Sequence, residues 1–325
     1  MGTRHAGTRY AAMVLAVTAA CSAVSCRRYW VCDATDDDRT TQLPRHLSET
    51  GLYADLQAGT LAAGVVAFQP QFALWSDGAE KRRWIALPPG TRIDTSDPDD
   101  WIFPTGTRLW KEFRRDGVRV ETRLLTRTGP GEDDWIGLAY LWDDGEHDAT
   151  AAPWGATNAR GTPHDVPASG ECMACHGGRR SRVLGFSAIQ LAKRPTGDAD
   201  LEAIDHAPAL TVPGDATERA ALGYLHANCS HCHNPRRPAR GGPRCFDPEK
   251  SIDFRLLVDH LGSAADTPAR RTGPGAAFEP RDPSGSKLIT RISTRGLFAQ
   301  MPPVATERVD DEAVVLLRAW IAGLP

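Results

Sequence analysis

The sequence predicts a multi-domain α+β protein, in which an N-terminal antiparallel β-sandwich-like domain precedes a mainly α-helical part. Its length of 325 residues fits two or three domains. Between residues 51 and 165, short runs of strand-forming residues alternate with turn residues. From about residue 216 onward, apolar residues recur at helical spacing.

The overall composition is that of an ordinary globular protein. The formal net charge is -3, so no nucleic-acid or membrane-surface partner is indicated by charge. Hydrophobic residues make up 41% of the chain, which is enough for ordinary cores.

Residues 1–26 are expected to be an export signal. Two arginines precede an apolar run over residues 10–20, which is too short to span a bilayer. Small residues precede Cys21 and Cys26, so lipid attachment to one of them and simple cleavage near Ala20 both remain open. The predicted location is periplasmic or exported, with a lipid anchor in the first alternative.

Residues 27–50 are charged and polar and are expected to form a linker. In the β-rich region 51–165, strand residues 118–124 alternate between apolar and charged side chains, which predicts a half-buried strand. Six of the nine tryptophans fall between residues 75 and 142, and a tryptophan-rich core is favoured over a binding face. Asp77, in Trp-Ser-Asp-Gly, is expected to cap backbone amides in a turn.

Two copies of a five-residue motif carry the chemistry of the second half. They are Cys172-Met-Ala-Cys175-His176 and Cys229-Ser-His-Cys232-His233. Thiols at i and i+3 lie on one helix face and can bond the two vinyl groups of a haem, while the adjacent histidine reaches the iron. The sequence therefore predicts two covalently attached haem c groups. A zinc site is the weaker alternative for either pair, and a disulfide for the first.

Met301 is the predicted sixth ligand of the second iron. A thioether opposite a histidine raises the reduction potential of a haem. Two of the other three methionines lie in the leader, and Met173 lies inside a motif. Two prolines follow Met301 and restrict its loop. A terminal helix is then predicted from Asp310 to about Gly323.

The first iron has several candidate distal ligands, or none, and these stay open: His164, Lys193, His206, His226 and His260. The arginines after the first motif either contact haem propionates or form a solvated turn; they are Arg179, Arg180 and Arg182. His231, inside the second motif, is expected to face solvent.

The order of helix with motif, long loop, Met301 and terminal helix resembles a class I cytochrome c over residues 216–325. In that family the first and last helices cross, which implies a contact involving Gly223, Tyr224 and Trp320. More broadly, the chain resembles a family of exported bacterial dihaem c-type cytochromes with an N-terminal β domain. The stretches that carry this resemblance are LWSDGAEKR, WIFPTGT, CMACH with LGFSAIQL, YLHANCSHCHNP and MPP.

This resemblance implies a first haem c segment over residues 166–215, although Ala192-Lys-Arg-Pro departs from the family's usual Asn-rich continuation. The expected function is one-electron transfer between redox partner proteins. A dihaem peroxidase-like enzyme with an open first iron is an alternative. A third is a β-domain ligand-binding protein with a cytochrome electron outlet. Cys32 and Cys245 remain as a candidate disulfide pair.

Overall fold

The computed structural model describes residues 38–192, 210–237, 250–296, 299–303 and 306–325. The predicted export signal lies outside these residues, as do Lys193, His206 and the cysteines considered for lipidation or a disulfide, which are Cys21, Cys26, Cys32 and Cys245. Among the described helices, none is long and apolar enough to cross a bilayer.

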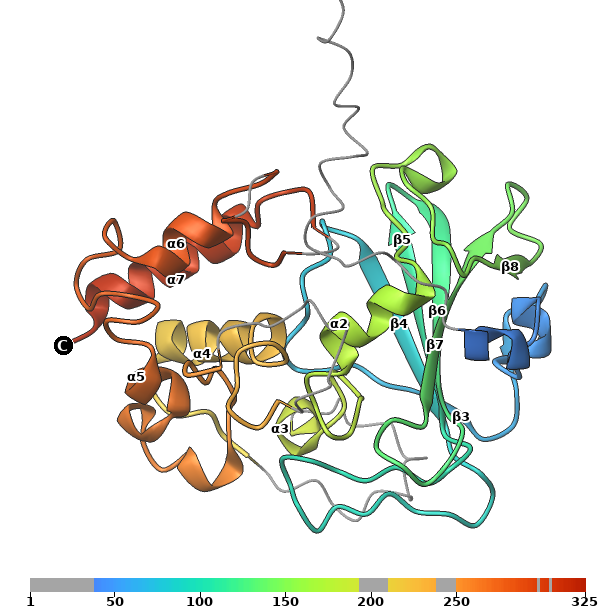
Figure 1. Cartoon of the computed structure of the whole chain (residues 1–325), viewed down its shortest axis with the longest axis horizontal. Helices are drawn as coiled ribbons and strands as arrows, with labels where there is room; N and C mark the ends of the chain where they lie inside the picture. The colour runs from blue at the N-terminus through green and yellow to red at the C-terminus, as the bar shows by residue number, and fades with distance from the viewer. Residues whose placement is uncertain (1–37, 193–209, 238–249, 297–298, 304–305) are drawn as a thin grey trace, which may run out of the picture.

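A six-stranded antiparallel sheet forms the centre of the N-terminal half (Figure 1). Its strands pair in sequence order: β3 (Val65–Ala67), β4 (Glu80–Ala86), β5 (Arg108–Arg115), β6 (Val118–Arg127), β7 (Trp135–Trp142) and β8 (Ala149–Ala151). The β5–β6 hairpin turns through Asp116 and Gly117, both at positive φ (51° and 81°). Asp-Gly is the pair that such tight hairpins favour. The mixed α+β class and the antiparallel sheet are confirmed.

One face of the sheet is covered by the segment that precedes it. This segment contains two 3₁₀ helices, η2 (Asp38–Gln42) and η3 (Leu47–Glu49), and a two-stranded sheet of β1 (Tyr53–Asp55) and β2 (Thr60–Leu61). Leu47 and Leu52 are fully buried against Trp84, Trp110 and Trp142. The described part of the predicted linker therefore belongs to the core, and the sheet is covered here mainly by loops and short helices instead of a second large sheet.

The other face of the sheet is covered by the predicted first haem segment. Phe186 lies between Phe68, Trp101 and Phe103, with ring centroids 4.7 to 5.9 Å away. The short helices of this part are η4 (Ala159–Gly161), η5 (Ser169–Glu171), α2 (Cys172–His176) and α3 (Ala188–Leu191). Figure 1 shows α2 and α3 between the sheet and the C-terminal helices.

Because both faces are covered, strand β6 is buried on both sides, and the prediction that it is half-buried is wrong. The tryptophan prediction is confirmed: of the six tryptophans between residues 75 and 142, five are at most 6% exposed and Trp75 is half-buried, whereas Trp154 is exposed.

The C-terminal part is helical. Its elements are α4 (Ala216–Asn228), η6 (Val258–His260), η7 (Ala264–Asp266), α5 (Pro268–Thr272), α6 (Lys287–Ile292) and α7 (Asp311–Gly323). Asp215 caps α4 by accepting from the Glu218 amide, and Asp310 caps α7 by accepting from the Ala313 amide. Each such cap contributes about 1 kcal/mol. The two long helices thus begin and end close to where the sequence predicts.

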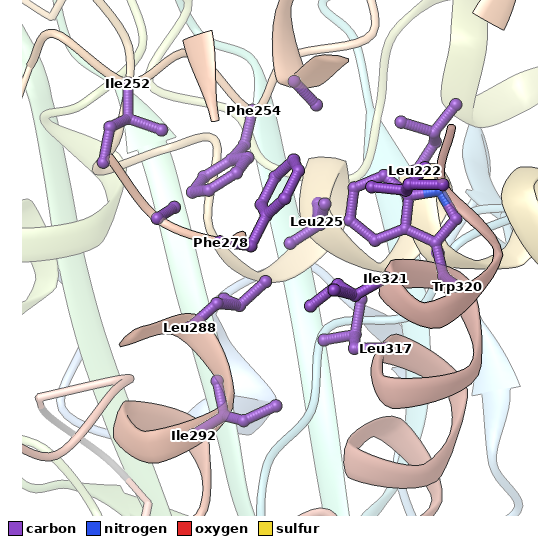
Figure 2. Close-up of a cluster of buried hydrophobic side chains, with 14 of the residues drawn as sticks. Leu222, Leu225, Ile252, Phe254, Phe278, Leu288, Ile292, Leu317, Trp320 and Ile321 are labelled. Carbon is purple, nitrogen blue, oxygen red and sulfur yellow. The ribbon is translucent and has the colours of Figure 1, made fainter. Parts of the chain in front are cut away.

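Helices α4 and α7 pack against each other through one buried apolar cluster (Figure 2). Leu225, Leu317 and Ile321 are fully buried, and each side chain contributes about 1.5–3 kcal/mol. Trp320 packs edge-on against Phe278 at 4.9 Å. The expected contact between the two helices is present. The space next to Gly223, where a side chain would lie, is however filled by the ring of Phe72 from the N-terminal half.

Candidate functional site

The two Cys-x-x-Cys-His motifs lie against each other. The first forms α2, and the second follows directly after the end of α4. The Sγ atom of Cys232 is 4.0 Å from the carbonyl oxygen of Ala174, inside the first motif. A Cβ atom at Gly178 would collide with the carbonyl oxygen of His231, so the two backbones meet at a glycine.

Two polar side chains after the second motif tie the motifs together. The guanidinium of Arg237 donates to the carbonyl oxygens of His231 at 2.9 Å and Ala174 at 3.1 Å. Asn234 Nδ2 donates to Ser230 O at 2.7 Å and to Gly178 O at 3.3 Å. Asn234 and Arg237 are both buried, so these bonds are shielded from water. The relative position of the two motifs is therefore fixed by packing and by hydrogen bonds.

All four motif cysteines are free thiols. Burial raises the pKa of Cys172 and of Cys229 to about 12, and it also raises the pKa of Cys175 and Cys232. Among the described residues, no three His, Cys, Asp or Glu side chains are grouped to hold a metal ion. The zinc and disulfide alternatives therefore gain no support here.

His176 is held in the orientation that a metal ligand needs. Its Nδ1 atom lies 2.7 Å from the carbonyl oxygen of Arg182, which assigns the ring proton to Nδ1 and leaves Nε2 as the free acceptor. Burial lowers the pKa of His176 to about 4, so the ring is neutral at pH 7. A neutral imidazole whose other nitrogen binds a carbonyl is a common arrangement for metal ligands.

His233 closes the second motif by donating its backbone amide to Cys229 O at 2.8 Å. Its ring packs edge-on against Phe254, with centroids 5.8 Å apart. Phe254 also donates its amide to the His233 carbonyl at 3.2 Å. The strand-like segment around Phe254 therefore supports this histidine.

Met301 lies half-buried in the loop between α6 and α7. Its amide donates to Arg291 O at 3.0 Å, and its carbonyl accepts from Arg295 at 3.2 Å. Arg295 is close enough to Tyr224, on α4, for its charge to act on the tyrosine's pKa, which burial raises. The loop thus lies near the C-terminal turns of α4.

Asp77 caps backbone amides, as predicted, but these amides are far from it in the sequence. Its carboxylate accepts from the amides of Glu307 at 2.8 Å and Arg308 at 3.1 Å, just beyond the Met301 loop. Its own φ is 52°, a left-handed conformation that Asp tolerates. A residue of the N-terminal half therefore positions the loop that carries Met301.

The same segment of the N-terminal half also contacts α4. The Trp75 amide donates to Asn228 Oδ1 at 2.6 Å, and Asn228 Nδ2 donates to Ala73 O at 3.2 Å. Asn228 directly precedes Cys229. The indole Nε1 of Trp75 is buried and has no hydrogen-bond partner among the described residues. An unpartnered buried donor here fits a site that an anionic group completes.

The described candidates for the first distal ligand are engaged elsewhere. His164 Nε2 donates to the buried Glu121 at 2.6 Å, and His226 Nδ1 accepts from the Leu256 amide at 3.0 Å. His260 Nδ1 lies 3.1 Å from Asp266 O. His231 was expected to face solvent, but it is 5% exposed, because it packs beneath the first motif and lines a narrow cavity beside His226.

The three arginines after the first motif are used within the protein. Arg182 is 3% exposed and binds Asp133 at 2.5 Å and the Gly177 carbonyl at 2.5 Å. Arg179 donates to Asp99 O at 3.0 Å, while Arg180 forms an exposed pair with Glu132 at 2.7 Å. Arg182 is therefore a structural residue of a buried turn, and the prediction that it lies in a solvated turn is wrong.

A group of basic residues that the sequence analysis missed lies on the sheet beside the first motif. Arg83, Lys111 and Arg123 are direct cross-strand neighbours on β4, β5 and β6. Lys81 lies two residues before Arg83 on the same face. We refer to these four residues as the cationic row. The alternation over residues 118–124 predicts Arg123 on the exposed side of a half-buried strand, and no local pattern marks Lys81, Arg83 and Lys111 as one group.

The chain was compared with protein-family models, with curated proteins and with solved structures, and none of the three comparisons found a match.

Proposed function

We propose that the protein is an exported c-type cytochrome that carries two covalently attached haems and transfers single electrons between redox partner proteins. The observation that carries this proposal is the direct contact between two Cys-x-x-Cys-His motifs, clamped by Arg237 and Asn234. Two unrelated motif matches would have no reason to meet in the fold. The family proposal is that of exported bacterial dihaem cytochromes, with residues 216–325 forming a class I cytochrome c-like unit.

The residues at the two motifs fit haem attachment. Each thiol would add across a vinyl group, so that the S–H bond is replaced by a C–S bond and the hydrogen goes to the neighbouring carbon, with no net oxidation. A neutral His176 is the protonation state that a metal ligand needs. His176 and His233 would be the proximal ligands of the two irons, and Met301 the distal ligand of the second.

When bound, haem c supplies one-electron chemistry. The chain's contribution is to hold the two attachment points at a fixed, short separation. Gly178 allows the backbones to touch, and Arg237 and Asn234 keep them there. In each turnover the protein would accept one electron from a donor protein and pass one electron to an acceptor protein, so its own oxidation state is restored.

The location proposed is the periplasm or another exported compartment, with a lipid anchor if Cys21 or Cys26 is modified. This follows from the leader sequence and from the need of the attachment chemistry for reduced thiols outside the cytoplasm. No specific observation on the described residues favours the peroxidase-like or ligand-binding alternatives.

The direct test is to produce the protein in a host that matures c-type cytochromes. Intact mass and a pyridine haemochrome assay should report two haems for each chain. The variants Cys172→Ala/Cys175→Ala and Cys229→Ala/Cys232→Ala should each report one. A colourless wild-type protein would overturn the proposal, and a wild type with one haem would overturn the relay between two.

A further inference from the structure

The cationic row places like charges directly opposite each other. Arg83 pairs in register with Lys111, and Lys111 pairs with Arg123, across three neighbouring strands. Like charges at such positions destabilise a sheet. The row also lies under α2 and the segment after it, on the face of the sheet that carries Leu109 and Leu125. An anion bound at this row would reduce the repulsion between its positive charges.

The described residues supply too few carboxylates for this row. Of its four members, only Arg123 has an ion pair among the described residues, with the buried Glu121, which His164 also binds. Lys111 Nζ lies over the ring of Phe113 at 4.8 Å, and Arg83, 7% exposed, donates to Gln69 at 3.3 Å. Lys81 donates to Leu74 O at 2.6 Å, and the charges of Asp77 and Asp310 also act on it.

Burial acts on all three of the remaining cations. It lowers the pKa of Lys81 to about 8 and that of Arg83 to about 10. Burial, followed by the charge of Arg83, lowers the pKa of Lys111 well below its ordinary value. Arg83 is 7% exposed, and Lys81 and Lys111 are half-buried, so each of these cations is partly removed from water. The negative charges of two carboxylates would offset this loss of hydration and the repulsion within the row.

The first motif is the immediate neighbour of the row. Cys172 lies directly on Gly137 of β7, where a Cβ atom would be 2.9 Å from Cys172 Sγ. Gly137 pairs with Leu125, and the next pair on the same face is Ala139 with Arg123. The charges of Lys111 and Arg123 act on both Cys175 and His176. A group bonded at Cys172 and Cys175 would therefore lie within reach of the row.

We propose that the cationic row binds the two propionate carboxylates of the haem attached at Cys172 and Cys175. This inference rests on the proposed function. Arginine offers a planar fork that matches a carboxylate, and lysine adds a point charge, so the row holds both kinds of partner. The sheet thereby forms a wall of the first haem site. Arg179, Arg180 and Arg182, the other candidates for this role, are already bound within the protein.

The first experiment measures the two reduction potentials of the full-length, haem-loaded protein. A nearby positive charge favours the reduced state, so Lys111→Met and Arg83→Gln should each lower one potential and leave the other unchanged. The expected change is a tenfold lower ratio of reduced to oxidised haem at fixed potential, or about 59 mV for one electron. Arg180→Gln is the matched control, because it removes an exposed, screened cation after the same motif.

The second experiment asks whether the row needs the haem. In the Cys172→Ala/Cys175→Ala background, which lacks the first haem, Lys111→Met should raise the urea midpoint by relieving repulsion. In the haem-loaded protein the same substitution should lower the midpoint, and Arg180→Gln should change neither. A general packing defect would lower both midpoints.

The outcomes separate the two proposals. If wild type carries no covalent haem, the proposed function fails and this inference fails with it. If two haems are present but Lys111→Met and Arg83→Gln leave both potentials unchanged, only the assignment of the cationic row is overturned. The same holds if Lys111→Met shifts the midpoint in one direction in both backgrounds.

Discussion

Replacing Gly178 with alanine tests the contact on which the relay depends. A methyl group at this position would occupy the space of the His231 carbonyl oxygen and press on the guanidinium of Arg237. Both are buried, and neither is the free end of an exposed side chain. The backbones of the two motifs must therefore move apart, because normal contacts between such atoms are near 3.5 Å.

The cost can be worked out from two contributions. Overpacking a buried site costs about 1–3 kcal/mol. Displacing His231 also weakens the charged hydrogen bond from Arg237, which contributes about 1.5–3 kcal/mol. We expect Gly178→Ala to lower the free energy of unfolding by about 3–5 kcal/mol. Under the proposed function, electron exchange between the two proposed haems, followed after flash reduction, should also become slower.

The assay is urea unfolding of the full-length, haem-loaded protein. Gly262→Ala is the control, since a Cβ atom there meets nothing within 4 Å and its φ is not in the left-handed region. That control should change stability by less than about 1 kcal/mol. A Gly178→Ala protein as stable as the Gly262→Ala protein would refute the close approach of the two motifs.

Three further predictions concern other parts of the site. Asp77→Ala removes the acceptor of two amides beyond the Met301 loop and should lower the free energy of unfolding in urea by about 2–4 kcal/mol. Asp77→Asn keeps one acceptor and tolerates positive φ, so it should lower this free energy by less. Equal losses for the two variants would argue against the cap. Met301→Ala should lower one reduction potential and let an added ligand such as imidazole bind that haem, as seen in absorption spectra; unchanged spectra and potentials would show that another residue is the ligand. Burial lowers the pKa of His226 to about 3, so below pH 6.5 the unfolded chain gains a proton that the folded chain does not. This ring alone should lower stability by about 1.4 kcal/mol per pH unit down to about pH 3, and the burial of His176 and His231 adds to the slope in the same direction. His226→Gln should reduce the measured slope by that amount, and an unchanged slope would contradict the burial of this ring.

Local signals in the sequence were sufficient for the elements whose causes are local. Helices α4 and α7 can be predicted because apolar residues recur at helical spacing after an aspartate that caps the start of each helix. The strands can be predicted because turn residues separate the apolar runs. Asp77 was expected to cap amides because of its turn, and it does. Its partners, Glu307 and Arg308, were not predictable, since nothing in the local sequence links positions 230 residues apart.

The errors share one physical cause, which is that burial depends on what covers a surface. Strand β6 alternates like a half-exposed strand, yet Glu121 and Arg123 lie beneath the first motif. His231 was placed in solvent for the same reason. Residues 27–50 were expected to be a linker because they are polar, but in the described part, residues 38–50, Leu47 is fully buried in the core.

The close fit of the two motifs constrains the order of events in biogenesis. Once α2 has docked against the end of α4, Cys232 is buried beside the Ala174 carbonyl, whereas Cys172, Cys175 and Cys229 stay partly exposed. Under the proposed function, haem attachment at Cys232 would therefore precede this docking.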